Sequence, residues 1–307
     1  MRVRQKPETQ RLSSLDGAGG GANVPLSDKR TIGSIKAMLP QGGMLATEMA
    51  NVRLDTSGGH ARLSLQRPDK LNPLDWATVR ELKQAVETIE AMDDVFVVSI
   101  IGSGRSFSAG GDLDGYLRLY REPAEFSAFL DDFYAMLVGI ENSKKVYVAL
   151  INGVCVAGGL ELLLACDLVL AADTARIGDG HLNFGQLPGA GGSQRLPRAI
   201  GMLRAKHLML TGQLLTADEA REIGLVNEVV PHAELESALD RLVGQLAEKS
   251  RVGLASAKHL ANKTLTSDLE EGLRYEMDFV LNYATTEPDA TEGLLAFKEK
   301  RKPVYQS

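Results

Sequence analysis

The sequence has few cysteines, few aromatic residues and no long hydrophobic run. Cys155 and Cys166 are the only cysteines among 307 residues, and both lie inside apolar segments. They indicate small core residues in a reducing compartment rather than a disulfide framework. No apolar run reaches the roughly 18 residues that suggest a membrane-spanning helix, so we expect no membrane span. The 34 Lys and Arg against 40 Asp and Glu give a net charge of −6, which argues against a general affinity for nucleic acid.

Several motifs of cofactor and catalytic sites are also missing. No glycine-rich segment ends in Gly-Lys-Ser or Gly-Lys-Thr, and none shows the Gly-x-Gly-x-x-Gly spacing with an acidic partner that binds a dinucleotide. No Gly-x-Ser-x-Gly elbow of a serine hydrolase occurs. The histidines lack the close spacing of metal ligands, so we expect no metal site. They are His60, His181, His207, His232 and His259.

The first 45 residues differ from the rest of the chain. They contain the segment Gly17–Ala22 and show no hydrophobic periodicity, which predicts a disordered leader over residues 1–45. Basic residues near the N-terminus would also fit a cleaved targeting peptide, but acidic residues interrupt them and no apolar segment for secretion follows. We expect a core over residues 46–250, a C-terminal helical region over 251–307 and a cytoplasmic protein.

Strand and helix patterns alternate after residue 51, which predicts an α/β core with parallel strands. Alternating apolar residues predict a hairpin over 52–66, and nearly continuous apolar runs predict strands that are buried on both faces. After Pro188 the chain turns mostly helical, with a capping box at Thr216–Glu219, a short strand over 225–230 and three further helical patterns that end at Phe297. The other expected elements are helices over 75–92, 126–140 and 158–166 and strands over 95–101, 146–151 and 168–171.

Glycine is abundant, with 31 residues, and two clusters follow buried strands. The first loop is Ser106–Leu113, and the second is Asn152–Glu161. Glycine lets a backbone approach a ligand closely, and a helix N-terminus presents unpaired N–H groups. Two such amides aimed at one point would stabilise the oxygen of an enolate. The residues alone leave a simpler interpretation open, in which both loops are tight turns.

With Leu71–Leu74, Leu187–Leu196 and the tail Phe297–Arg301, these loops resemble the crotonase superfamily, which is the enoyl-CoA hydratase/isomerase family. The resemblance runs from about Asn51 to Tyr305. It implies an α/β fold, a spiral of ββα turns with a C-terminal helical trimerisation region. It also implies an acyl-CoA thioester as substrate, with coenzyme A entering as part of the substrate and no other cofactor. The implied assembly is a homotrimer or a dimer of trimers.

The resemblance also implies the catalytic residues. The backbone N–H groups of Gly111 and Gly158 would form the oxyanion hole, and Glu161 matches the first of two hydratase glutamates. The position of the second glutamate holds His181, which can act as acid or base near neutral pH but lacks a carboxylate's geometry and charge. His181 would therefore either share the proton transfers or only line the acyl pocket. Asp179 would either orient His181 or belong to a surface turn.

Candidate contacts to coenzyme A come from three segments of the chain. The resemblance places them before the first helix, in the first glycine loop and in the tail. The tail could instead be a solvated basic helix face, and Asp112 could simply cap a helix. Tyr116, Leu117 and Tyr120 could line the acyl end of the pocket. The candidates for binding are Lys70, Leu71, Ser108, Ala109, Gly110, Asp112, Leu113, Phe297 and Lys300.

We therefore expect an enzyme that adds water across an α,β-unsaturated CoA thioester through an enolate. The replacement by His181 keeps two catalytic alternatives open, an enoyl-CoA isomerase and a hydrolase or lyase that acts on the thioester or on a carbon–carbon bond. A non-catalytic acyl-CoA-binding protein is a further alternative, although the retained Glu161 argues against it.

Overall fold

The computed structural model describes residues 45–306, so the predicted leader lies outside the described residues apart from its last position, Leu45. Within this range the chain forms two sheets. One has seven strands in the order β1-β2-β3-β4-β6-β8-β11, and the other has four in the order β10-β9-β7-β5. The strands are β1 (Leu45–Glu48), β2 (Val52–Ser57), β3 (His60–Leu65), β4 (Val97–Gly102), β5 (Ser106–Ser108), β6 (Val146–Ile151), β7 (Val154–Val156), β8 (Leu168–Ala172), β9 (Arg176–Gly178), β10 (Leu215–Thr216) and β11 (Glu228–Val230).

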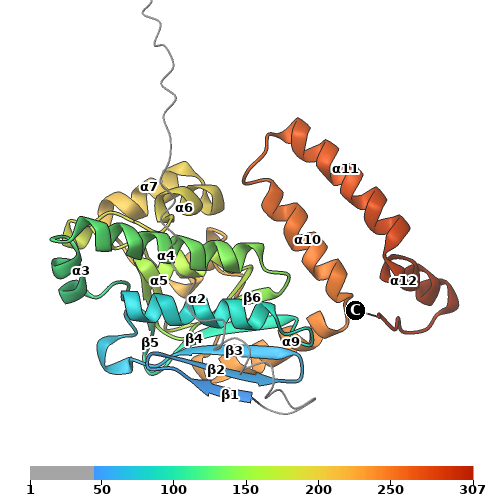
Figure 1. Cartoon of the computed structure of the whole chain (residues 1–307), viewed down its shortest axis with the longest axis horizontal. Helices are drawn as coiled ribbons and strands as arrows, with labels where there is room; N and C mark the ends of the chain where they lie inside the picture. The colour runs from blue at the N-terminus through green and yellow to red at the C-terminus, as the bar shows by residue number, and fades with distance from the viewer. Residues whose placement is uncertain (1–44, 307) are drawn as a thin grey trace, which may run out of the picture. The chain divides into compact units, whose positions relative to one another are not determined.

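The helices cover the large sheet and extend away from it at the C-terminus (Figure 1). Helix α2 begins where the Asp75 carboxylate accepts a hydrogen bond from the Thr78 amide (2.9 Å), as expected of an N-cap. The helices are η1 (Pro68–Lys70), α2 (Trp76–Glu90), α3 (Leu113–Leu119), α4 (Pro123–Asn142), α5 (Gly158–Ala165), η2 (His181–Phe184), α6 (Gly192–Ile200), α7 (Met202–Thr211), α8 (Ala217–Glu222), η3 (His232–Glu234), α9 (Leu235–Ala247), α10 (Arg251–Lys263), α11 (Leu269–Thr286) and α12 (Pro288–Glu299).

A repeated unit brings distant loops together. Strands β4, β6 and β8 run parallel in the large sheet, and each is followed after a short turn by β5, β7 or β9 in the small sheet, where these three also pair in parallel. Parallel strands place their carboxyl ends at the same edge, so the segments that follow β5, β7 and β9 lie near one another. The predicted α/β spiral of ββα turns is thus the observed fold.

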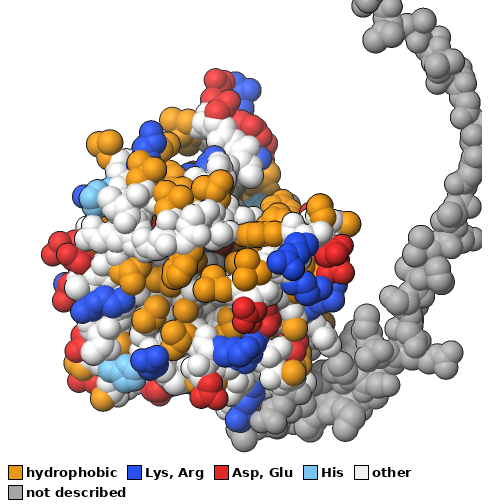
Figure 2. Space-filling view, turned by 90° about the vertical axis from the view of Figure 1, so that its left-hand side faces the viewer, with side chains coloured by type: hydrophobic (Ala, Val, Ile, Leu, Met, Phe, Trp, Pro, Cys, Tyr) orange, Lys and Arg blue, Asp and Glu red, His pale blue; other side chains and the backbone are white. Residues whose placement is uncertain are grey.

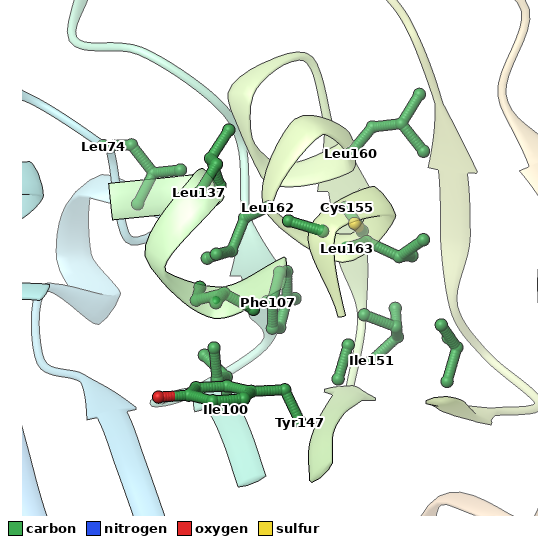
Figure 3. Packing of buried hydrophobic residues seen from close by; sticks show 14 of the residues in the cluster. Leu74, Ile100, Phe107, Leu137, Tyr147, Ile151, Cys155, Leu160, Leu162 and Leu163 are labelled. Carbon is green, nitrogen blue, oxygen red and sulfur yellow. The ribbon is translucent and has the colours of Figure 1, made fainter. Parts of the chain in front are cut away.

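The large sheet is buried on both faces, which explains its continuous apolar strands. On one face Ile100, Tyr147 and Ile151 pack with the core cluster to which α2, α4 and α5 contribute. Figure 3 shows Phe107 and leucines of α5 in this cluster. On the other face Val146 and Val148 belong to a second cluster, to which α9 contributes. Adjacent residues of one strand therefore serve two different cores.

The structure corrects some details of the prediction. Strand β1 was not expected, and the short strands β5 and β7 lie inside the two segments that were predicted as loops. Four helices rather than three follow β11, because the chain breaks near Ser250, the N-cap of α10, and at Pro288. The hairpin, the capping box of α8 and the other predicted helices and strands are present, with β11 shorter than expected. None of the described helices is long and apolar enough to cross a membrane.

Asn72 fastens the chain before α2 to the first glycine loop. Its buried side chain donates to the carbonyls of Ser103 and Ser106 (both 2.9 Å) and accepts from the Arg67 amide (3.0 Å). Its backbone φ of 55° is in the left-handed region, which asparagine tolerates better than most residues. The side chain of Ser108 donates in turn to the Asn72 carbonyl (2.8 Å).

We expect Asn72→Ala to lower the free energy of unfolding by about 3 kcal/mol, because it leaves buried backbone groups without partners and adds strain. Urea unfolding followed by circular dichroism measures this change. The matched control is Gln84→Ala on the exposed side of α2, which should change stability by less than about 0.5 kcal/mol. Equal stability of the two variants would show that Asn72 does not hold the loop.

Candidate active site

A cavity of about 410 Å³ opens where the segments after β5, β7 and β9 meet. Its walls come from the start of α3, from α4, from the N-terminal end of α5 and from the segment 180–190. Seven of the predicted site residues line it. These are Lys70, Ala109, Gly111, Asp112, Leu113, Glu161 and His181.

Glu161 is the buried acid of the site, with 2 % of its surface exposed. Helix α5 starts at Gly158 and is apolar around it, so the carboxylate has lost nearly all its water. Oε1 accepts hydrogen bonds from the amides of Ala190 (2.8 Å) and Gly192 (2.9 Å). Burial raises the Glu161 pKa, although these amides oppose the rise. Glu161 is thereby fixed in place by one oxygen and presents the other, Oε2, as a proton carrier.

Arg195 supports the loop that holds Glu161. Its Nη1 donates to the carbonyl of Ala190 (2.7 Å), and its Nε and Nη2 form a two-point contact with the Glu141 carboxylate (2.6 and 2.8 Å). Such a bidentate pair fixes both position and orientation. Arg195 and Glu141 therefore link the end of α4 to the loop whose amides bind Glu161.

His181 lies opposite Glu161. Its Nε2 is 3.9 Å from Glu161 Oε2, too far for a direct hydrogen bond. Its Nδ1 is 3.1 Å from Asp179 Oδ2, which is within ion-pair distance, and neither of these two buried atoms forms a hydrogen bond in the described range. Asp179 is 1 % exposed, so it is not part of a surface turn. The pairing orients the ring with Nδ1 toward Asp179 and Nε2 toward Glu161 (assigned from heavy-atom positions).

Two backbone amides come from neighbouring segments of the chain. The segment around Gly110 packs against the start of α5, since a Cβ built on Gly110 would lie 3.3 Å from the Gly158 nitrogen. Neither the Gly111 N–H nor the Gly158 N–H donates a hydrogen bond to another group in the described part of the chain. Ala157, just before Gly158, has φ of 51°, which turns the chain sharply into the helix. Both amides are therefore without a partner within residues 45–306; Gly111 lines the cavity, and Gly158 follows Ala157, which also lines it.

An aromatic wall closes the cavity on the side of α3 and α4. Phe129 and Phe133 are buried and Phe126 is partly buried, as expected of core residues, but all three also line the cavity. Tyr116 and Tyr120 of α3 and its C-cap extend the wall, with Tyr116 stacked on Tyr120 at a centroid distance of 5.8 Å. Leu117 is exposed and is not in the wall. On this side of the molecule hydrophobic side chains gather at the surface between charged groups (Figure 2).

Comparison with known proteins agrees with this geometry. A sequence model of the family described as enoyl-CoA hydratase/isomerase matches residues 55–307. The chain belongs to the enoyl-CoA hydratase/isomerase family. It is 36 % identical over 246 residues to a probable enoyl-CoA hydratase of Mycobacterium bovis, covering 79 % of this chain and 93 % of that one. It is 36 % identical over 260 residues to a crotonyl-CoA hydratase of Syntrophomonas wolfei, covering 84 % and 98 %.

Solved structures of the same family share the fold. An enoyl-CoA hydratase of Geobacillus kaustophilus superposes with a TM-score of 0.81 at 33 % identity, covering 86 % of this chain and 99 % of that one. An enoyl-CoA hydratase of Bacillus anthracis gives 0.78 at 34 % identity, covering 83 % and 99 %. The chain is thus an enzyme of the hydratase/isomerase family with the fold that its sequence resembles.

The residues predicted to bind coenzyme A fall into three groups in this family member. Lys70, Ala109 and Leu113 lie at the cavity, as does Asp112, which also caps α3 by accepting from the Gly115 amide (3.1 Å). Leu71, Ser108 and Gly110 instead hold the loops together. The Ala109 amide donates to the Leu71 carbonyl (2.9 Å), and the Gly110 amide donates to the buried Ser108 hydroxyl (3.1 Å).

The tail residues lie elsewhere. Phe297 is 87 % exposed on α12, and Lys300 forms the end of that helix. Neither lines the cavity of its own chain, and Figure 1 shows α12 on the far side of the molecule from α3. The structure therefore does not bring Phe297 and Lys300 to the site within one subunit.

Three contributors to this family site were not anticipated from the sequence. These are the Ala190 and Gly192 amides, the Arg195–Glu141 pair and the hydroxyl of Tyr116 as a polar group beside Gly111. Gly189–Arg195 was recognised only as part of a motif, and the run of glycines before a helix was the available signal for amides that bind a carboxylate. Glu141 carries no signal, because it meets Arg195 only where α4 and α6 both pack on α5.

Proposed function

We propose that this protein is an enoyl-CoA hydratase, which adds water across the Cα=Cβ double bond of an enoyl-CoA thioester. The observation that carries the proposal is the arrangement of Glu161 Oε2 and His181 Nε2, which face each other across 3.9 Å beside two free amides. A water molecule can hydrogen-bond to both atoms at that separation. Relatives that are named enoyl-CoA hydratase and crotonyl-CoA hydratase support the same reaction.

The thioester oxygen would accept hydrogen bonds from the Gly111 and Gly158 amides. These bonds strengthen as negative charge develops on that oxygen, so they stabilise the enolate more than the substrate. A pair of free amides of this kind contributes on the order of 3 kcal/mol per donor to lowering the barrier.

The two side chains would divide the proton transfers. His181 Nε2 takes a proton from water, whose oxygen bonds to Cβ while the Cα=Cβ electron pair moves toward the thioester oxygen. Glu161, whose pKa burial raises, gives its proton to Cα. The histidine then returns its proton to the Glu161 carboxylate, and the site is restored with one water consumed. No step requires a metal or a redox cofactor, and coenzyme A enters as part of the substrate.

A product screen tests the proposal. The protein is incubated with crotonyl-CoA, longer enoyl-CoAs, and aromatic and alicyclic enoyl-CoAs, and the products are analysed by mass spectrometry. We expect at least one substrate to gain the mass of one water, with a turnover number in the ordinary range of about 1–1,000 per second. A shifted double bond without added water would instead show an isomerase, and free coenzyme A detected with a thiol reagent would show a hydrolase. Binding by calorimetry without any product would show a non-catalytic protein.

We further propose a homotrimer, or a dimer of trimers, built on the C-terminal helices. Helices α11 and α12, together with Leu265 just before α11, carry large apolar side chains that are exposed in the single subunit. A subunit that packs on these helices could then place its own Phe297 and Lys300 at the cavity of its neighbour. The cysteines are both free, which fits our proposal of a cytoplasmic enzyme. These exposed apolar residues are Leu265 in the turn before α11, Leu269, Leu273, Met277, Val280 and Leu281 on α11, and Leu294, Leu295 and Phe297 on α12.

A further inference from the structure

Tyr116 stands beside one of the two amides of the proposed oxyanion hole. A Cβ built on Gly111 would lie 2.1 Å from Tyr116 Cε2 and 2.5 Å from its Oη. The hydroxyl is therefore at most about 4 Å from the Gly111 Cα. Tyr116 is also close enough to Glu161 for that carboxylate to help raise the tyrosine pKa. The hydroxyl thus lies at the reacting end of the cavity rather than at its far wall.

Glycine at position 111 leaves room for the Tyr116 ring. The backbone at Gly111 does not have a positive φ, so its conformation is open to other residues. What requires glycine there is the Tyr116 ring, which occupies the place of a side chain. An alanine at position 111 would have to displace the ring.

The Tyr116 ring has little freedom to move away. Tyr120 stacks on it at a centroid distance of 5.8 Å and an interplanar angle of 7°, and Phe129 meets it edge-on at 5.9 Å and 68°. Aromatic pairs of this kind are worth about 0.5–1.5 kcal/mol each beyond the area that they bury. The ring is therefore held on Gly111 from two sides.

Tyr116 lines the cavity, and its hydroxyl forms no hydrogen bond within residues 45–306. Burial, aided by the negative charge of Glu161, raises the Tyr116 pKa well above its ordinary value. The hydroxyl consequently stays protonated at any working pH and can donate its hydrogen. Tyr116 is partly exposed at the cavity, so a substrate oxygen in the cavity can accept from its hydroxyl.

We infer that the Tyr116 hydroxyl is a third donor to the thioester oxygen, acting beside the Gly111 and Gly158 amides as negative charge develops there. This inference rests on the proposed function, because it assigns Tyr116 to the same enolate. It makes Tyr116 a catalytic residue, whose hydrogen bond strengthens in the transition state.

The test is Tyr116→Phe, which removes one oxygen and keeps the ring that packs on Gly111. We expect kcat on the best enoyl-CoA to fall by about 10- to 100-fold, while KM changes by less than about threefold. Tyr134→Phe is the matched control, because Tyr134 is exposed on α4 outside the cavity and should keep full activity. Thermal unfolding of both variants should match that of the unmodified protein.

A second readout separates this inference from the hydration reaction. The exchange of the α-protons of butyryl-CoA in deuterium oxide reports enolate formation without addition of water, and Tyr116→Phe should slow it by the same factor as kcat. Unchanged exchange and kcat in Tyr116→Phe would overturn the role of Tyr116 and leave the hydratase intact, as would a rise in KM alone. A protein that exchanges α-protons but hydrates no enoyl-CoA would overturn the hydratase, with slower exchange in Tyr116→Phe still supporting the donor. Absence of both reactions in the unmodified protein would overturn both.

Discussion

Replacing Glu161 by glutamine should lower kcat by about 10³-fold, because the amide cannot give a proton to Cα and take one back from His181. The glutamine oxygen can still accept from the Ala190 and Gly192 amides, so the side chain should keep its place. KM for an enoyl-CoA should change by less than about fivefold, since the binding surface is preserved. Steady-state kinetics on the best substrate of the product screen measure both constants.

Thermal unfolding provides the control for this variant. Burial raises the Glu161 pKa, so the folded state disfavours the ionised form, and stability falls as pH rises from the ordinary glutamate pKa through the raised pKa of the folded state. The side chain introduced by Glu161→Gln is neutral at every pH, so we expect the melting temperature near pH 7 to be unchanged or higher. Activity above a tenth of the unmodified level would remove Glu161 from the proton transfers. A lower melting temperature would instead show that the amide does not fit its two donors.

The glycine loops show which parts of the site a sequence can predict. The resemblance to the family located Gly111, Gly158 and Glu161, because its motifs are short runs of consecutive residues. Local chemistry fits this assignment, since N–H groups at the start of a helix are unpaired and an ionisable residue in an apolar helix is costly unless it is used or paired. The structure places Gly111 and Glu161 at one cavity and Gly158 next to Ala157, which lines it.

The wall of the cavity could not be predicted in the same way. Phe129 and Phe133 have the helical spacing of core residues, and they are core residues, yet the same rings face the cavity. Whether a buried aromatic meets another side chain or an open space depends on the segment opposite, here 180–190, which is distant in sequence. The position of Tyr116 could not be predicted for the same reason, because its ring fills the space that a side chain at Gly111 would occupy. The place of Asp179 was left open because Asp-Gly is also a common surface turn.

The second large expected effect on kcat comes from breaking the contact between Asp179 and His181. Asp179→Asn should lower kcat about 10²-fold or more, although Asn has nearly the same shape. An asparagine side chain can donate its N–H to His181 Nδ1, and the neutral ring would then carry its proton on Nε2. That tautomer has no free electron pair facing the substrate water, so it cannot act as the base. Kinetics of Asp179→Asn, with KM expected to move little, measure the loss.

A double-mutant cycle distinguishes this role from simple packing. His181→Ala should itself lower kcat about 10²-fold, and Asp179→Asn/His181→Ala should be no slower than His181→Ala, because Asp179 acts only through the ring. Asp131→Asn, at an exposed position on α4, serves as the matched control and should keep full activity. Additive losses in the double variant would mean that Asp179 does not act through His181. An unaltered kcat and pH–rate profile in His181→Ala would reduce His181 to a residue that lines the pocket, and Glu161 alone would then have to perform both proton transfers.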